Sequence, residues 1–170
     1  MKYNRQEAAQ RLLDSYRTYY NITGYQEGEL PLPLLSLGEY YETAQQYILH
    51  RKAEVWSANC EEFLYMFSTA HLTADECRRM LAYAQEDGMQ RAHIGKGHMY
   101  TYITPLILCD TAEEEAIRLL KKCRTYRSFL FSIHGWMEMH TAVLVMEKGK
   151  LYTNPRGKCL VKNLRGILAL

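Results

Sequence analysis

Two uncharged apolar segments, at residues 63–67 and 98–109, constrain the fold of this chain more than any other feature. The first, Phe63-Leu64-Tyr65-Met66-Phe67, is apolar throughout, which is typical of a central β-strand buried on both faces. The second predicts a long strand, in which Pro105 marks a bulge or an edge position because proline cannot donate a ladder hydrogen bond. Helical patterns lie around both segments, so we expect a sheet crossed by helices.

The N-terminal 50 residues have a different pattern. A capping box precedes a predicted helix over about 5–20. A second such box, Ser36 with Glu39, precedes apolar residues at helical spacing, which predicts a helix over about 37–50. Between the two, the apolar segment 30–35 cannot be helical at its prolines and should lie extended against another surface.

Together these patterns predict an α+β fold. The expected helices are at about 5–20, 37–50, 74–87, 112–124 and 158–166, and the expected strands at 52–58, 61–69, 98–109, 128–134, 138–147 and 150–154. We expect a single mixed or antiparallel sheet of five to six strands, with helices mainly on one face and a two-helix N-terminal arm. The expected domains are this arm with its proline-rich linker at 1–50 and an α+β domain at 51–170, unless the two form one integrated domain.

The tyrosine content suggests a role for the arm. The chain has 14 Tyr but only 4 Phe and 2 Trp, and eight of the 14 tyrosines lie in residues 1–47. Tyrosine is favoured at protein interfaces because its ring is apolar and its hydroxyl can be hydrated. We therefore predict that the arm binds a second copy of the chain or another protein, and that the chain is a small non-catalytic binding or protein-interaction module.

The cysteine pattern and the absence of several motifs argue against other classes of protein. The five cysteines are odd in number and lack C-x-x-C spacing, so we expect reduced thiols in a cytoplasmic protein rather than disulfides or a zinc ribbon. No apolar run is long enough to predict a signal peptide or a membrane span. The glycine-rich loops that bind nucleotide phosphates are absent, and we expect no cofactor.

A set of histidines and a glutamate offers an enzymatic alternative. Glu138 and His140 should point to the same face of a strand, and His134 could approach them across a turn. With His98, these side chains are the ligand types of a zinc or iron site. This alternative is a metal-dependent hydrolase, and whether the chain is an enzyme stays open.

Cys109 is a second catalytic candidate. It ends the strand at 98–109, directly before Asp110 and a predicted helix start, where backbone N–H groups can activate a thiol. With a histidine nearby it could act as a nucleophile, whereas a cysteine at the end of an apolar strand is also an ordinary packing residue.

The C-terminal segment is basic. From Lys148 onward the chain has six basic residues and no acidic one. Such a segment can bind phosphates, and a tyrosine beside it can stack on a base. A third alternative is therefore nucleic-acid binding, by Tyr152, Arg156, Lys158, Lys162 and Arg165.

Three short strings carry a family resemblance: His-Met-Tyr-Thr-Tyr-Ile at 98–103, His-Gly-Trp-Met at 134–137 and Thr-Asn-Pro-Arg-Gly-Lys at 153–158. Together they resemble a family of uncharacterised bacterial proteins of the clostridial type, over roughly residues 37–165. No activity is established for that family. The resemblance therefore implies a bacterial cytosolic protein and assigns no catalytic residue.

Overall fold

The computed structural model of the protein describes residues 3–26, 28–46 and 56–169. In this part of the chain, four α-helices pack on an eight-stranded mixed sheet. The helices are α1 (Arg5–Tyr16), α2 (Ala74–Arg91), α3 (Glu114–Lys122) and α4 (Leu160–Leu168), with a short 3-10 helix, η1 (Arg156–Cys159), before α4. The strands are β1 (Asn21–Gly24), β2 (Leu34–Gln46), β3 (Trp56–Leu72), β4 (His98–Ala112), β5 (Tyr126–Ser128), β6 (Trp136–Met139), β7 (Ala142–Val145) and β8 (Lys150–Thr153).

The sheet has antiparallel margins and a parallel centre. Strands β1, β2 and β3 form an antiparallel meander, and α2 then connects β3 to its parallel neighbour β4. The other edge of β4 pairs in parallel with both β6 and β7. Strand β5 pairs antiparallel with β6, and β8 pairs antiparallel with β7.

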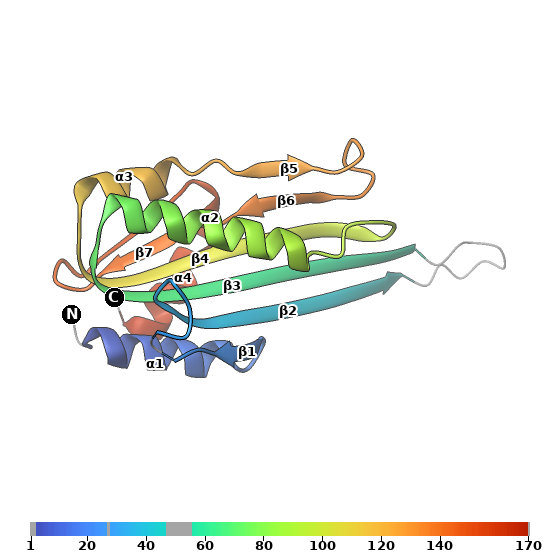
Figure 1. Ribbon diagram of the computed structural model, residues 1–170. Coiled ribbons are helices and arrows are strands. Elements are labelled where there is room, and N and C mark those ends of the chain that lie inside the picture. The colour runs from blue at the N-terminus through green and yellow to red at the C-terminus, as the bar shows by residue number, and fades with distance from the viewer. Residues whose placement is uncertain (1–2, 27, 47–55, 170) are drawn as a thin grey trace.

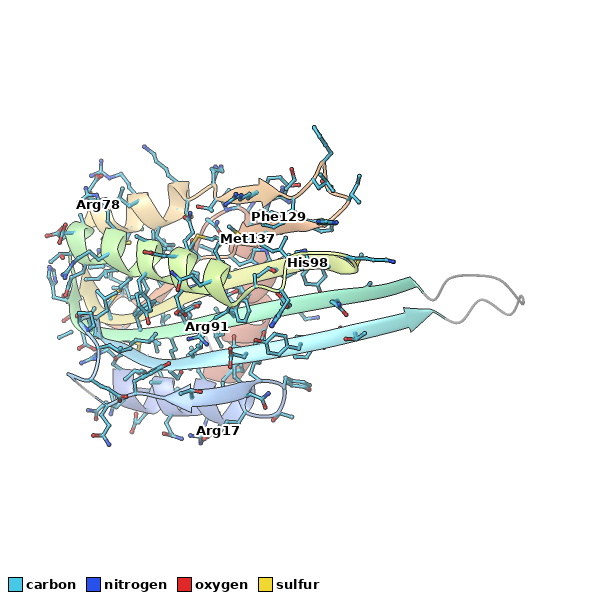
Figure 2. All side chains as sticks on the ribbon, turned by 45° about the vertical axis from the view of Figure 1, so that its right-hand side comes forward. Arg17, Arg78, Arg91, His98, Phe129 and Met137 are labelled. Carbon is cyan, nitrogen blue, oxygen red and sulfur yellow. The ribbon has the colours of Figure 1, made fainter. Side chains whose placement is uncertain are left out.

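Helices cover both faces of the sheet, as Figure 1 shows, with α2 and α3 on one side and α1 and α4 on the other. Arg78 and Arg17, labelled in Figure 2, lie on these opposite sides. The central strand β3 is buried on both faces, as its apolar sequence predicts: Phe63 and Tyr65 pack on the α2 side, and Leu64 and Met66 pack on the α1 side. No helix among the described residues is long and apolar enough to cross a membrane.

The expected fold is wrong in its strand count, in its helical arm and in the placement of its helices. The α+β class holds, but the described residues have eight strands rather than five to six, and two helices lie on each face. The predicted helix at 37–50 is instead the strand β2, apart from 47–50, which lie outside the described residues. Long antiparallel pairing with β3 overrides the helical spacing there, and tyrosine and threonine suit a strand better than a helix.

Other boundaries also differ from the expected ones. The predicted strands at 52–58 and 61–69 belong to one strand, β3, with 52–55 outside the described residues. Helix α2 continues through Gly88 to Arg91, beyond the expected end near residue 87. Position 88 suits a glycine, because a Cβ there would lie 2.7 Å from Ile103 Cδ1.

Pro105 lies inside the sheet, opposite an interruption between β6 and β7. Ile103 O accepts from His140 N–H (2.9 Å), so alternate β4 residues, including Pro105, direct their backbone groups toward β6 and β7. Proline has no N–H to continue this ladder. Pairing accordingly stops after Met139 and resumes at Ala142. The two residues between them, His140 and Thr141, lie at the candidate site.

Candidate functional site

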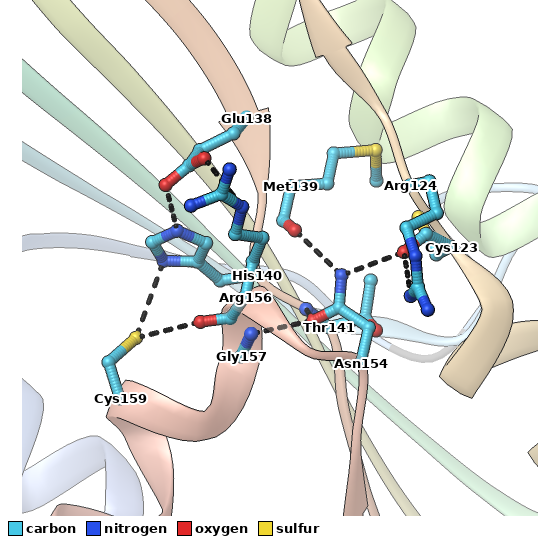
Figure 3. Close-up of polar contacts among 10 residues, drawn as sticks. All are labelled: Cys123, Arg124, Glu138, Met139, His140, Thr141, Asn154, Arg156, Gly157 and Cys159. Atoms are coloured by element: carbon cyan, nitrogen blue, oxygen red, sulfur yellow. Dashed lines mark hydrogen bonds and ion pairs between the residues drawn. The ribbon is translucent and has the colours of Figure 1, made fainter.

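Glu138 and His140 form a buried pair on the face of the sheet covered by α1 and α4. They are two residues apart on an extended segment and so point to the same side, as the sequence predicts. His140 Nε2 lies 2.9 Å from Glu138 Oε1, and Arg156 Nε lies 3.3 Å from Glu138 Oε2 (Figure 3). Both residues of the pair are 7 % exposed, so its hydrogen bonds are largely protected from water.

Cys159 completes a series of three side chains. Its Sγ lies 3.6 Å from His140 Nδ1, on the opposite side of the imidazole from Glu138 (Figure 3). Cys159 Sγ also lies 3.3 Å from Arg156 O, so the single thiol proton can be donated to either of these two acceptors, and Cys159 itself is exposed. Because the carboxylate of Glu138 can only accept, the hydrogen-bond network assigns the Nε2 proton to that contact and leaves Nδ1 for the thiol.

Asn154 holds the segment that carries Cys159 in place. Its buried side chain accepts from the backbone N–H groups of Thr141 (3.1 Å) and Gly157 (2.6 Å). The same amide donates to the carbonyl oxygens of Met139 (2.9 Å) and Cys123 (3.1 Å). One side chain therefore ties η1 to the interruption between β6 and β7 and to the end of α3 (Figure 3).

The surroundings of His140 make its imidazole more basic. Burial alone lowers the pKa of the imidazole, but the hydrogen bonds and charges of Cys159 and Glu138 outweigh burial and raise that pKa above 6.5. The imidazole ring also packs against the ring of Tyr102, and the two ring centroids lie 4.4 Å apart. The imidazole is thus oriented and suited to exchange a proton with the thiol.

His98 and His134 belong to a different network. His98 Nδ1 lies 2.7 Å from His134 O, and His98 Nε2 lies 2.8 Å from Thr101 Oγ1. Thr101 donates to the buried carboxylate of Glu61, which also bonds to His93 Nδ1 at 2.7 Å. Figure 2 shows His98 beside Phe129, near the start of β4.

The four predicted metal ligands therefore do not form one site, since His98 bonds the backbone of His134 whereas Glu138 and His140 pair with each other and with Cys159. Within the described ranges, no group of three or more histidine, cysteine, aspartate or glutamate side chains could hold a metal ion.

Cys109 and Asp110 lie in a packed part of β4. The Cys109 side chain is fully buried and donates to Leu144 O at 3.6 Å. Burial, with the neighbouring charge of Asp110, raises the pKa of this thiol to about 12. Asp110 forms an ion pair with Arg5 (3.0 Å). These contacts give both residues structural roles.

The predicted phosphate-binding residues have separate surroundings. Arg156 pairs with Glu138, and Tyr152 is half-buried against the core on the α2 side. Lys158, Lys162 and Arg165 are exposed on η1 and α4. Lys162 and Cys159 line the same shallow surface hollow.

Sequence reasoning missed Cys159. A usable signal was present in the segment Asn154-Pro155-Arg156-Gly157-Lys158-Cys159, which ends a strand and leads directly into a helix with no acidic residue in its first turn. A cysteine at a helix start beside basic residues has the surroundings of a reactive thiol.

The fold and the site define a small α+β protein in which an exposed cysteine faces a buried histidine–glutamate pair. The chain belongs to the family described as a domain of unknown function, DUF8052, whose model matches residues 4–166. Its resemblance to an uncharacterised family is thereby confirmed. Comparisons with curated proteins and with solved structures gave no match.

Proposed function

We propose that the protein is a thiol-dependent enzyme that transfers or hydrolyses an acyl group. The observation that carries the proposal is the alignment of Cys159 Sγ, the His140 imidazole and the Glu138 carboxylate through contacts of 3.6 and 2.9 Å. A nucleophile, a base and a group that orients the base is the arrangement that covalent catalysis requires.

The chemistry follows from this order. His140 Nδ1 takes the thiol proton, and the sulfur of Cys159 forms a bond to the acyl carbon while the carbonyl π electrons move to oxygen. When the carbonyl re-forms, the bond to the leaving group breaks and that group takes the proton from His140. Water, deprotonated by His140, then attacks the thioester, the C–S bond breaks and the thiol regains its proton.

A cavity of about 290 Å³ beside the thiol supplies room for a small substrate. Cys159, His140 and Asn163 are among its lining residues. Asn163 lies in α4, four residues beyond Cys159, which is the N-cap residue of that helix, and both residues line this cavity. The carboxamide N–H of Asn163 is a donor suited to the negative oxygen that forms after attack.

Reaction with p-nitrophenyl acetate tests the proposal. We expect acetylation of Cys159, located by mass spectrometry, and a rate about 30-fold lower in His140→Gln, equivalent to about 2 kcal/mol of barrier. Cys159→Ser should remove the thiol-dependent reaction. Cys123→Ser, at a partly buried thiol outside the site, is the matched control and should react like the wild-type protein.

Equal rates in the wild-type protein and His140→Gln would contradict the proposal, because an exposed thiol without a partner reacts independently of the imidazole. Circular dichroism of each variant separates a lost reaction from a lost fold.

The site also bears on location. We propose a bacterial, cytoplasmic protein, because all five cysteines are free and the proposed chemistry needs a reduced thiol at Cys159. The clostridial-type resemblance supports the same origin.

A second candidate function is an interaction module, and the hairpin between β5 and β6 offers a surface for it other than the N-terminal arm that the sequence predicted. Leu130, Phe131 and Ile133 are 56, 95 and 71 % exposed at its tip. Leu130, Phe131 and Ser132 all have positive φ angles (45°, 52° and 66°), a costly conformation for residues with side chains. An exposed apolar tip on a strained backbone is typical of a contact surface, and we propose that it binds a second copy of this chain.

Sedimentation velocity at high micromolar concentration tests this self-association. We expect a dimer for the wild-type protein and, for Phe131→Ser, a dissociation constant raised about tenfold or more. Ile94→Ser, at an exposed apolar residue outside the hairpin, is the control and should leave the dimer unchanged. A monomeric wild-type protein would reject this second candidate.

A further inference from the structure

Tyrosine and glutamate alternate across four strands on the sheet face that α1 and α4 cover. Tyr40 of β2 is aligned with Glu62 of β3. Tyr102 of β4 is aligned with Glu62 on one side and with Glu138 of β6 on the other. Aligned residues on neighbouring strands point to the same face, so the four side chains form one row that leads to the thiol site.

Tyr16 at the end of α1, Tyr20 in the turn between α1 and β1, and Tyr100, two residues before Tyr102 on β4, enclose the centre of this row. Tyr20 donates its hydroxyl to Glu62 Oε2 at 2.6 Å, and its ring centroid lies 5.7 Å from that of Tyr40. Tyr16 packs edge-on against Tyr20 at 5.5 Å, and Tyr100 stacks on Tyr102 at 4.1 Å. We call the surface around Glu62 the tyrosine trough; its members are Tyr16, Tyr20, Tyr40, Tyr100 and Tyr102.

Two cavities open on either side of Tyr20 and Glu62, which line both of them. The first, of about 290 Å³, is the cavity that reaches His140 and Cys159. The second, of about 250 Å³, extends toward Tyr40 and Tyr100. A small ligand can therefore contact Glu62 and the aromatic rings while it points toward the thiol.

In the described part of the chain, the negative charge of the trough has no basic ion-pair partner. Among residues 3–26, 28–46 and 56–169, no ion pair involves Glu62 or its rim neighbour Glu42. Burial is the largest cause, and the charge of Glu62 the next, that raises the pKa of Tyr16 to about 12. A half-buried carboxylate among tyrosine rings is a stable arrangement when a cation is bound, because ring faces and carboxylate both attract positive charge.

We propose that the tyrosine trough binds a primary alkylammonium group, with the ammonium at Glu62 and the alkyl chain directed toward Cys159. The ammonium can donate to the Glu62 carboxylate while the tyrosine faces surround its charge, and the apolar chain can lie along the rings. The claim that this ammonium group is part of the substrate rests on the proposed function. The claim that the trough binds an ammonium group does not. The trough also gives a use for five of the 14 tyrosines.

Calorimetric titration with n-pentylammonium chloride tests the site. We expect saturable binding to the wild-type protein and to Cys159→Ser with the same dissociation constant, and binding about tenfold weaker or more in Glu62→Gln. Glu86→Gln, at an exposed carboxylate of α2 on the opposite side of the sheet, is the matched control and should bind like the wild-type protein. The neutral alcohol n-pentanol should bind at least tenfold more weakly than the amine.

Equal affinity in Glu62→Gln and Glu86→Gln, or equal affinity for amine and alcohol, would overturn the assignment, and so would the absence of wild-type binding. If Glu62→Gln fails to fold, Tyr40→Leu tests the same trough through its aromatic contact. Acetylation of Cys159 without amine binding would leave the proposed function standing and remove this inference. Amine binding by a protein whose Cys159 is unreactive would leave this inference standing and remove the proposed function.

Discussion

Asn154→Ala should lower the free energy of unfolding by about 3–5 kcal/mol, because it removes the side-chain hydrogen bonds of three buried backbone groups and a fourth, part-buried one to a carbonyl that Arg124 also contacts. The Asn154 side chain is 1 % exposed and bonds to Met139 O, Thr141 N, Gly157 N and Cys123 O. Alanine can replace none of these contacts, and the space that remains is enclosed. Urea denaturation followed by circular dichroism measures the difference.

Asn21→Ala is the control for this change. Asn21 is exposed on the edge strand β1, where substitutions usually alter stability by less than about 0.5 kcal/mol. If both variants unfold at the same urea concentration, Asn154 does not hold the site together. A folded Asn154→Ala protein should also show slower acetylation of Cys159, since η1 loses its attachment.

Gly157→Ala should destabilise the protein by about 3 kcal/mol and slow the reaction of Cys159. A Cβ at this position would lie 2.5 Å from Thr141 O and 2.8 Å from Asn154 Oδ1. The first of these atoms belongs to the backbone of the sheet, so η1 must move instead, which displaces Cys159 from His140. Thermal unfolding and the acetylation rate measure the two consequences.

Gly166→Ala is the matched control, because a Cβ there would meet no atom within 4 Å. Gly166 lies inside α4, where alanine is favoured by about 0.5–1 kcal/mol, so this variant should be slightly more stable than the wild-type protein. A Gly157→Ala protein of wild-type stability would contradict this prediction, because it would show that η1 accommodates a Cβ at this position.

Local signals in the sequence predicted the elements that are fixed locally. The capping box at Asn4 begins α1, the helix predicted at 74–87 lies within α2, and the apolar run 63–67 lies in a strand buried on both faces. The helix predicted at 37–50 is wrong over residues 37–46, because their spacing suits a helix while their actual structure depends on β3, which comes later in the chain. Pairing between distant segments leaves no local periodicity that distinguishes it from a helix.

For the candidate site too, the sequence predicts the part that local geometry determines and not the part that depends on distant contacts. Strand alternation alone places Glu138 and His140 together, and the sequence predicted this contact. The position of Cys159 depends on Asn154 and Gly157 fitting against the interruption between β6 and β7. No residue spacing encodes that fit, and the reactive-thiol prediction accordingly fell on Cys109, which is buried.

The interruption opposite Pro105 has a consequence for how the site works. The histidine of the proposed active site is held within the sheet itself, between two segments that are each hydrogen-bonded to β4, rather than on a loop at the sheet edge. Such an imidazole needs little rearrangement when a substrate arrives, so binding energy is not consumed in ordering it. The barrier to reaction then depends mainly on how the substrate itself is oriented.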